Sequence, residues 1–239
     1  MSSSTFVLIS GGWHSSACWQ RVVPLLEAQG HRVLTPELLG MGEDPTPLSQ
    51  INLASWADQV ANIIQNEEKA VILLGHSRSG LIISEVAERV PEKIRLLVYL
   101  SAFLLPSGES LAGSTSDTDN REWVVIDPTG TITLVPDKIV PVFYNTTAPE
   151  WTERVPSLIS PEPITTIFTS LNLTDDRFGR VPRAYIECKQ DNSLPLTKQH
   201  SMQARLPCKY VTTMDTDHSP FFSAPSELVA HLIELATKQ

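Results

Sequence analysis

One stretch of ten residues constrains the fold of this chain more than any other. It spans residues 71–80 and reads Val-Ile-Leu-Leu-Gly-His-Ser-Arg-Ser-Gly. Its first four residues are apolar without a polar break, which predicts a strand buried on both faces. Residues 78–90 then show the apolar spacing of a helix. A strand that turns abruptly into a helix at a serine is typical of a nucleophile elbow, with Ser77 at its apex.

The residue sizes around Ser77 agree with such an elbow. Because the backbone of the serine is strained, the residues two before it and two or three after it must be small, or strand and helix collide. Gly75 meets the first requirement, and Ser79, followed by Gly80, stands where a glycine is usual. The alternative is an ordinary strand–turn–helix crossover with an incidental serine.

The composition argues against several classes of function. The chain has 239 residues, a net charge of −9 and no basic cluster, which argues against nucleic acids and anionic membranes as partners. Cys18, Cys188 and Cys208 are far apart and form no C-x-x-C pair, so we expect packed, reduced thiols and no metal site. The chain has no run of about eighteen apolar residues and no signal-like start, so we expect a soluble cytoplasmic protein. We expect one domain, as a monomer or homodimer.

Strands and helices alternate along most of the chain. Short apolar runs predict strands, and amphipathic spacing predicts the helices between them. Strands are expected at 6–9, 32–35, 71–74, 94–100, 183–188 and 209–213, and helices at 17–28, from 52 or 55 to 65, and at 78–90, 196–205 and 225–237. This alternation predicts an α/β fold, with a parallel sheet covered by helices on both faces.

Residues 103–180 interrupt this rhythm. Prolines, threonines and serines are frequent there, aromatic residues are scattered, and the periodicity fades. We therefore expect a cap, or lid, at 103–180, inserted into a core formed by 1–102 and 181–239. The alternative is a poorly periodic continuation of the sheet.

A serine nucleophile needs a base to take its proton, and His218 is the strongest candidate. It follows the last predicted strand in a turn-rich loop, where open α/β sheets place their ligands. Asp191 lies just past the preceding predicted strand and can hold the tautomer of the histidine. Asp217 and Asp215 are weaker candidates, because side chains close to the histidine in sequence rarely face it. The chain order Ser77, Asp191, His218 is that of the α/β-hydrolase triad.

The other five histidines are weaker candidates for the base. His76 precedes the serine, and its side chain should point away from the Ser77 hydroxyl. His14 lies in the glycine-rich loop after the first strand and is a candidate for substrate contact. For the remaining three we expect surface or packing roles: His31, His200 and His231.

The same chemistry requires donors for an oxyanion. One N–H is expected from the residue after the nucleophile, which is Arg78, and one from the loop after the first strand. That loop reads Ser-Gly-Gly-Trp over residues 10–13, and its glycines allow a close approach of the backbone to a substrate carbonyl. We choose Gly12 as the second donor.

Several of these segments together resemble a known family. The resemblance rests on Ser10-Gly-Gly-Trp-His, Cys18-Trp19, Gly75-His-Ser, Tyr185-Ile-Glu-Cys-Lys-Gln-Asp and Asp217-His218, and it covers nearly the whole chain. These segments are similar to the α/β-hydrolase branch of plant methylesterases and hydroxynitrile lyases, with bacterial carboxylesterases such as pyrethroid hydrolases as relatives. The resemblance implies an α/β-hydrolase fold with a mostly parallel sheet and a cap inserted after the sixth-strand region. It also implies no cofactor, and it assigns the catalytic roles to Ser77, Asp191 and His218, with backbone donors at Gly12 and Arg78.

Four positions depart from the pattern of that branch. Its hydroxynitrile lyases carry a threonine in the oxyanion loop and a lysine after the catalytic histidine, where this chain has Gly11 and Ser219; this disfavours lyase activity. Ser10 stands where the family usually has histidine. Arg78 stands where many relatives have an apolar residue, and its side chain either adds positive charge near the site or points to solvent.

The triad and the resemblance together imply a serine hydrolase that cleaves a carboxylic ester of a small, mostly apolar molecule. Candidate substrate-contacting residues are Gly11, Trp13, His14, Phe103, Leu104, Trp123, Phe143, Ser219, Phe221 and Phe222. Hydrolysis of a lactone or thioester would need the same catalytic residues. Two further functions are compatible with the same scaffold, namely a hydroxynitrile lyase and a small-molecule receptor with a hydrolase fold.

Overall fold

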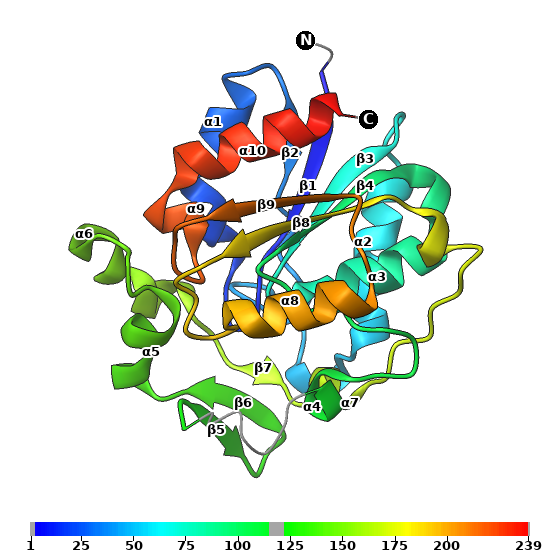
Figure 1. Ribbon diagram of the computed structural model, residues 1–239. Coiled ribbons are helices and arrows are strands. Elements are labelled where there is room, and N and C mark those ends of the chain that lie inside the picture. Colours follow the sequence, from blue (N-terminus) through cyan, green and yellow to red (C-terminus); the bar gives the residue numbers. More distant parts are fainter. Residues whose placement is uncertain (1–2, 115–121, 239) are drawn as a thin grey trace.

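The computed structural model describes residues 3–114 and 122–238 and contains a six-stranded sheet (Figure 1). Its strands are β1 (Thr5–Ile9), β2 (Arg32–Leu34), β3 (Val71–His76), β4 (Ile94–Leu100), β8 (Arg183–Cys188) and β9 (Tyr210–Met214). They lie in the order β2-β1-β3-β4-β8-β9, and all neighbours pair in parallel. The predicted α/β fold with a mostly parallel sheet is confirmed.

The strand order places a topological switch point between β1 and β3. The chain runs from β1 outward to β2, returns past β1 to β3, and then continues in the opposite direction. Ile9 at the end of β1 pairs with Gly75 in β3. His76 at the end of β3 pairs with Leu100 at the end of β4. The loops that follow these strands therefore share the carboxyl edge of the sheet, where open α/β sheets bind their ligands.

Helices cover both faces of the sheet, because successive side chains of a strand point to opposite faces. In β1, Val7 and Ile9 belong to one buried apolar cluster, and Phe6 and Leu8 belong to the other. The first cluster also holds residues of α2 (Leu53–Gln65), α3 (Ser79–Arg89) and α8 (Leu196–Arg205). The second holds residues of the 3-10 helix η1 (Ser16–Arg21), α1 (Val23–Glu27), α9 (Pro220–Ser223) and α10 (Pro225–Thr237).

Asn52, one of the two predicted caps, begins α2. Its side chain accepts the N–H of Ser55 at 2.9 Å, and the Ser55 hydroxyl accepts the N–H of Asn52 at 3.1 Å. This reciprocal pair forms a capping box that satisfies donors at the start of the helix. Two short 3-10 turns complete the core: η2 (Leu48–Gln50) and η3 (Pro91–Lys93).

The prediction of a single helix over residues 17–28 is wrong. The structure has η1 followed by the short helix α1, and the two meet at Val22. Pro24 cannot donate an N–H inside a helix, and its ring clashes with the preceding turn. The chain instead places Pro24 in the first turn of α1, where proline is tolerated. The other predicted helices and strands have the expected type.

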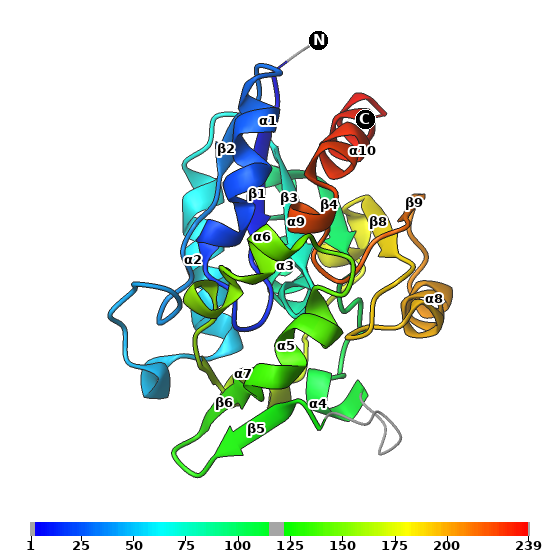
Figure 2. The ribbon, with the colours of Figure 1, turned by 90° about the vertical axis from the view of Figure 1, so that its left-hand side faces the viewer.

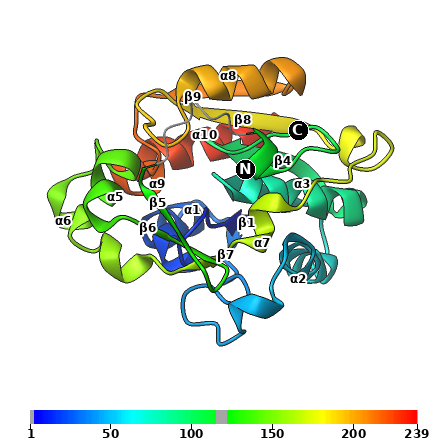
Figure 3. The same cartoon turned by 90° about the horizontal axis from the view of Figure 1, so that it is seen from below.

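Most of the residues between β4 and β8 form a layer over the carboxyl edge of the sheet. Figures 1 and 2 show this layer at the end of the molecule opposite the start of β1, and Figure 3 looks onto it. It contains a separate antiparallel sheet in the order β5-β6-β7. Its elements are α4 (Leu111–Ser114), β5 (Val124–Asp127), β6 (Thr131–Leu134), α5 (Pro136–Phe143), α6 (Pro149–Thr152), η4 (Val155–Leu158), β7 (Glu162–Pro163) and α7 (Thr165–Phe168). The 3-10 helix η5 (Phe178–Arg180) follows this layer and lies beside the last turn of α3, where the Phe178 N–H donates to Glu88 at 3.2 Å.

We refer to this layer as the cap. Its division from the core at residues 103 and 180 stays a prediction, and residues 115–121 lie outside the described part of the chain. No helix among the described residues is long and apolar enough to cross a membrane.

Candidate active site

Ser77 lies in the turn between β3 and α3. Its φ angle is 53°, in the left-handed region that is costly for a residue with a side chain. Hydrogen bonds to the segment after β4 hold this conformation. The Ser77 N–H donates to the carbonyl of Leu100 at 3.2 Å, and the Ser77 carbonyl accepts the N–H of Phe103 at 3.0 Å. The predicted strand–turn–helix with a strained serine is therefore present.

The positions predicted to be small around Ser77 are closely packed. A Cβ on Gly75 would lie 2.5 Å from the carbonyl oxygen of Ser79, and a Cβ on Gly80 would overlap the carbonyl of Phe103. Ser79 is fully buried, and its hydroxyl donates to the carbonyl of Ser10. The serine that replaces the usual glycine thus ties the start of α3 to the loop after β1.

Asp191 and His218 come from the loops after β8 and β9, and their side chains meet. His218 Nδ1 lies 2.5 Å from Asp191 Oδ2, and because a carboxylate only accepts, the ring donates this hydrogen. The same carboxylate accepts the Ser101 hydroxyl, and it accepts the N–H groups of Ser193 and Leu194 at 2.7 Å each. Asp191 is therefore held from several sides, and the neutral His218 ring keeps Nε2 as its acceptor.

His218 Nε2 is buried and has no hydrogen-bond partner within residues 3–114 and 122–238. In particular, it makes no hydrogen bond to the Ser77 hydroxyl in this structure. Hydrogen bonds between a nucleophile and its base are often long in the absence of substrate and tighten when the substrate binds.

His76 contacts the loop that carries His218, a position that the sequence did not indicate. Its Nε2 donates to the backbone carbonyl of His218 at 2.8 Å, and the two ring centroids are 4.6 Å apart. Burial, with His218 as a further cause, holds the pKa of His76 well below its usual value. His76 therefore acts as a neutral donor that holds this loop.

The loop after β1 passes beside the elbow. A Cβ on Gly11 would lie 3.0 Å from the Cβ of the elbow serine, so the approach depends on a glycine. The N–H of Trp13 donates to Glu162 Oε2 at 3.2 Å. His14 Nδ1 donates to the carbonyl of Gly12 at 2.6 Å. A side chain of the loop and one of the cap thus hold the two ends of the Gly12–Trp13 peptide group.

His14 is buried behind the loop and does not line the cavity described below. Its Nε2 accepts the hydroxyl of Tyr144, from the end of α5. Burial lowers the pKa of His14 to about 4, so the ring is neutral at neutral pH. The structure places this predicted substrate contact in a supporting position.

Arg78 carries a buried guanidinium at the start of α3, and its side chain does not point to solvent. Nη2 lies 3.1 Å from Glu162 Oε2 and 3.3 Å from the carbonyl oxygen of Gly11. The Cζ atom is 4.2 Å from the ring centroid of Trp56. Burial lowers the pKa of Arg78, and the carboxylate of Glu162 opposes that shift.

A cavity of about 270 Å³ opens at Ser77 and is mostly apolar. Three predicted pocket residues line it, namely Trp13, Phe103 and Trp123. The other predicted pocket residues are buried outside its lining: Gly11, His14, Leu104, Phe143, Ser219, Phe221 and Phe222. Phe143 is nonetheless close behind, since its ring centroid is 5.1 Å from that of Trp123.

Sequence reasoning missed most of the cavity wall. The missed residues are Leu111, Ala112, Val124, Ile126, Ile132, Glu162, Ile167 and Ser193. All but Ser193 belong to the cap, whose weak periodicity left no pattern that could select them. Ser193 lies two residues after Asp191, and this proximity was the one signal in the sequence that could have indicated it.

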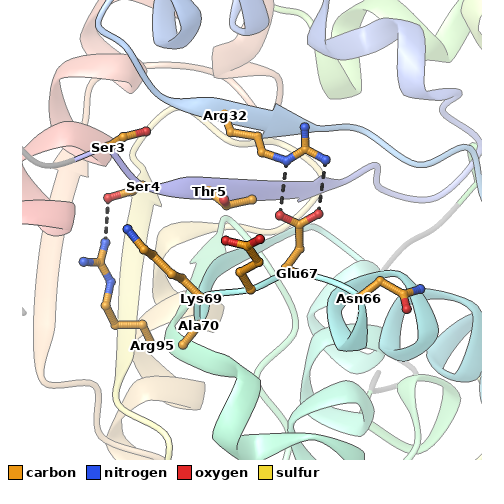
Figure 4. Close-up of a pocket in the computed structure, with 10 residues that line it drawn as sticks. Ser3, Ser4, Thr5, Arg32, Asn66, Glu67, Lys69, Ala70 and Arg95 are labelled. Atoms are coloured by element: carbon orange, nitrogen blue, oxygen red, sulfur yellow. Dashed lines mark hydrogen bonds and ion pairs between the residues drawn. The ribbon is translucent and has the colours of Figure 1, made fainter.

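A larger polar cavity of about 670 Å³ lies at the opposite, amino edge of the sheet (Figure 4). Two of the cationic side chains that line it have partners: Arg32 pairs with Glu67 at 3.1 Å, and Arg95 donates to the Ser4 hydroxyl at 2.9 Å. No histidine is among the described residues that line it. This cavity therefore lacks the base that serine chemistry requires.

The described residues offer no cluster of three or more His, Cys, Asp or Glu side chains that could hold a metal ion. Cys18, Cys188 and Cys208 are free thiols, and the first two are buried. Burial raises the pKa of Cys208 to about 12, so this thiol is protonated at neutral pH.

Comparison with known proteins identifies the family. The model of the alpha/beta hydrolase family matches residues 6–232. This chain belongs to that family. Methylesterase 1 of Arabidopsis thaliana is 32% identical to this α/β-hydrolase over 98% of the chain and 96% of its own length. A pyrethroid hydrolase of Sphingobium wenxiniae is 30% identical over 99% of this chain and 89% of its own.

Solved structures agree with this assignment. The crystal structure of a pyrethroid hydrolase from Sphingobium faniae superposes on this α/β-hydrolase with a TM-score of 0.89 and 28% identity. The match covers 99% of this chain and 98% of the other. The resemblance to the methylesterase-like branch is therefore confirmed.

Proposed function

We propose that this α/β-hydrolase is a cofactor-independent serine esterase that cleaves a carboxylic ester of a small, mostly apolar molecule. The hydrogen bond from His218 Nδ1 to Asp191 carries the proposal, because it leaves Nε2 of the same ring as a base at the edge where Ser77 is exposed to the cavity. The names of the relatives, a methylesterase and a pyrethroid hydrolase, support the same reaction class.

The reaction follows the roles that these positions allow. Ser77 Oγ attacks the ester carbonyl while His218 Nε2 takes its proton, and Asp191 stabilises the imidazolium that forms. The backbone N–H groups of Gly12 and Arg78 donate to the oxyanion. The imidazolium then protonates the leaving alcohol, and a water molecule activated by His218 releases the acid from Ser77.

The cavity favours a compact apolar substrate. Its volume of about 270 Å³ and its wall of aromatic and aliphatic side chains fit the acyl part or the alcohol part of a small ester. No lysine follows the histidine: Ser219 is fully buried there, and its N–H donates to Asp217 at 3.0 Å. A cation for cyanide is therefore missing from the position that lyases of this branch use.

The test compares the wild type with Ser77→Ala on p-nitrophenyl and methyl esters of graded acyl length. We expect turnover by the wild type and a loss of at least about 10³-fold in the variant, because a triad nucleophile is removed. Ser84→Ala is the matched control, since this serine is buried in α3, the helix that follows Ser77, and its hydroxyl bonds to Gly80 and Tyr99.

A fluorophosphonate reagent adds a second readout. Mass spectrometry should find its adduct on Ser77 in the wild type and in Ser84→Ala. Equal activity of the wild type and Ser77→Ala, or a wild type inert to every ester and to the reagent, contradicts the proposal. Cyanohydrin cleavage and ligand-induced thermal shifts would then test for a lyase and for a receptor.

A further inference from the structure

Arg78 has a side chain whose contacts go beyond the role of its backbone N–H. Its guanidinium is buried, and Nη2 donates to the carbonyl of Gly11 at 3.3 Å. That carbonyl belongs to the same peptide group as the N–H of Gly12. The side chain of Arg78 thus binds the peptide group that carries the Gly12 N–H, which is the other expected oxyanion donor.

The geometry of a peptide group makes this contact directional. In a planar trans peptide the C=O and the N–H point in opposite directions. A cation that binds the Gly11 carbonyl from one side therefore turns the Gly12 N–H toward the other side. A charged donor on the carbonyl also polarises the peptide, which strengthens the N–H as a donor.

The peptide needs such an anchor because glycine lies on both sides of it. Glycine adopts φ and ψ values that other residues avoid, so a Gly-Gly peptide can rotate at little cost. Gly11 cannot gain a side chain to restrict it, since a Cβ there would lie 2.5 Å from His76 Nδ1. The restriction has to come from a group outside the loop.

Glu162 of β7 completes the arrangement. Its Oε2 lies 3.1 Å from Arg78 Nη2 and accepts the N–H of Trp13 at 3.2 Å. The carboxylate compensates the buried charge and holds the peptide that follows the Gly12 peptide. Because β7 pairs with β6 through Ile132 and Glu162, the cap supplies this contact.

Stability alone does not account for this ion pair. Replacing a buried ion pair by apolar residues is often neutral or stabilising. Nε and Nη1 of Arg78 are buried without a hydrogen-bond partner among the described residues, so the fold leaves part of the guanidinium unsatisfied. The contacts that the guanidinium does make all lead to the loop beside Ser77, to Glu162 or to the face of Trp56.

We propose that the side chain of Arg78 is a positioning group that orients and polarises the Gly12 N–H, with Glu162 holding the guanidinium in place. This inference rests on the proposed esterase function. It predicts that the side chain of Arg78 acts on the transition state and leaves binding of the ground state unchanged.

The experiment compares the wild type with Arg78→Met, which keeps the apolar stem and removes every donor, and with Arg78→Lys, which keeps the charge. We expect Arg78→Met to lower kcat by about 10- to 100-fold with KM within about 2-fold, less than the 10²- to 10³-fold that loss of a whole donor costs. Arg78→Lys should recover part of the loss. Arg89→Met, on the same helix and paired with Asp58 and Glu85 away from the loop, should leave kcat unchanged.

Two inhibitors separate positioning from a structural role. An alkyl trifluoromethyl ketone forms an oxyanion on Ser77, whereas the matching secondary alcohol does not. Arg78→Met should weaken the ketone by the same factor as kcat and leave the alcohol within about 2-fold. Equal weakening of both inhibitors, or an unchanged kcat, overturns the inference while leaving the esterase proposal intact.

The amide NMR signal of Gly12 provides a readout independent of turnover. We expect its chemical shifts and its hydrogen exchange to change in Arg78→Met and in Glu162→Gln, but not in Arg89→Met. An unchanged Gly12 signal overturns the inference even in a protein without esterase activity. If Arg78→Met does not fold, the same measurements are made on Arg78→Lys and Glu162→Gln.

Discussion

His14 shows what a single buried residue contributes near the candidate site. Its ring donates to the Gly12 carbonyl and accepts from Tyr144, and the contact with Tyr144 requires the neutral form. Burial lowers its pKa from 6.5 to about 4. The folded chain therefore binds fewer protons than the unfolded chain between these values. The stabilisation is complete above pH 6.5 and is lost as the pH falls toward 4.

This linkage can be measured with His14→Asn, which keeps a donor for the Gly12 carbonyl and cannot titrate. Between pH 7.5 and pH 5, the unfolding free energy of the wild type should fall by about 2 kcal/mol more than that of the variant. The reason is that His14 takes up a proton in the unfolded chain but stays neutral in the folded one. Urea denaturation at the two pH values measures the difference. His200→Asn, at an exposed site on α8, controls for the loss of one imidazole, and equal pH sensitivity of His14→Asn and the wild type contradicts the prediction.

At the scale of elements, Asp217 joins the loop after β9 to the cap. Its carboxylate is fully buried and accepts the Thr146 N–H at 2.9 Å and the Thr147 hydroxyl at 2.8 Å. It also accepts the Ser219 N–H at 3.0 Å and the Ser223 hydroxyl at 2.8 Å. Asp217, the weaker candidate for the triad carboxylate, thus links the segment between α5 and α6 to the loop that carries His218.

Asp217→Asn tests this link, because one carboxylate oxygen becomes an amide group that cannot accept. Hydrogen bonds to charged groups contribute about 1.5–3 kcal/mol, so we expect a loss of about 2–3 kcal/mol of unfolding free energy. Hydrogen exchange at the Thr146 amide should become faster. Asp215→Asn is the matched control two residues away, on an exposed side chain that bonds to Gln190. A loss equal to that of this control would contradict the assigned link.

At the scale of the whole molecule, the cap shares the apolar clusters of the core. Leu171 and Leu173 join the cluster on one face of the main sheet. Phe143, Tyr144 and Val155 join the cluster on the other face. The cap therefore has no described cluster to itself that could stay folded while the core unfolds.

We accordingly predict that core and cap unfold together. Calorimetry should show one transition, with equal calorimetric and van't Hoff enthalpies. Tryptophan fluorescence from both parts of the chain should change at the same temperature, since Trp19 and Trp56 lie in the core and Trp123 and Trp151 in the cap. A separate transition at lower temperature would show that the cap is an independent unit.

Prediction from sequence succeeded where the signal is local. A continuous apolar run, a glycine two residues before a serine, and polar residues directly after strands are all readable within a few positions. These signals placed Ser77, Asp191 and His218 on one edge of the predicted sheet. Pro24 shows the limit even here, because the apolar spacing of residues 17–28 concealed a break that one proline imposes.

The sequence by itself therefore determined the parallel sheet, the elbow and the set of polar residues at its carboxyl edge, because strand period and turn chemistry act over short distances. Only the tertiary structure decided how that edge is completed. Glu162 contacts Trp13 from 149 residues away, and His14 meets Tyr144 across 130 residues. Such contacts depend on how the cap packs over the sheet, and no periodicity within the cap encodes that packing.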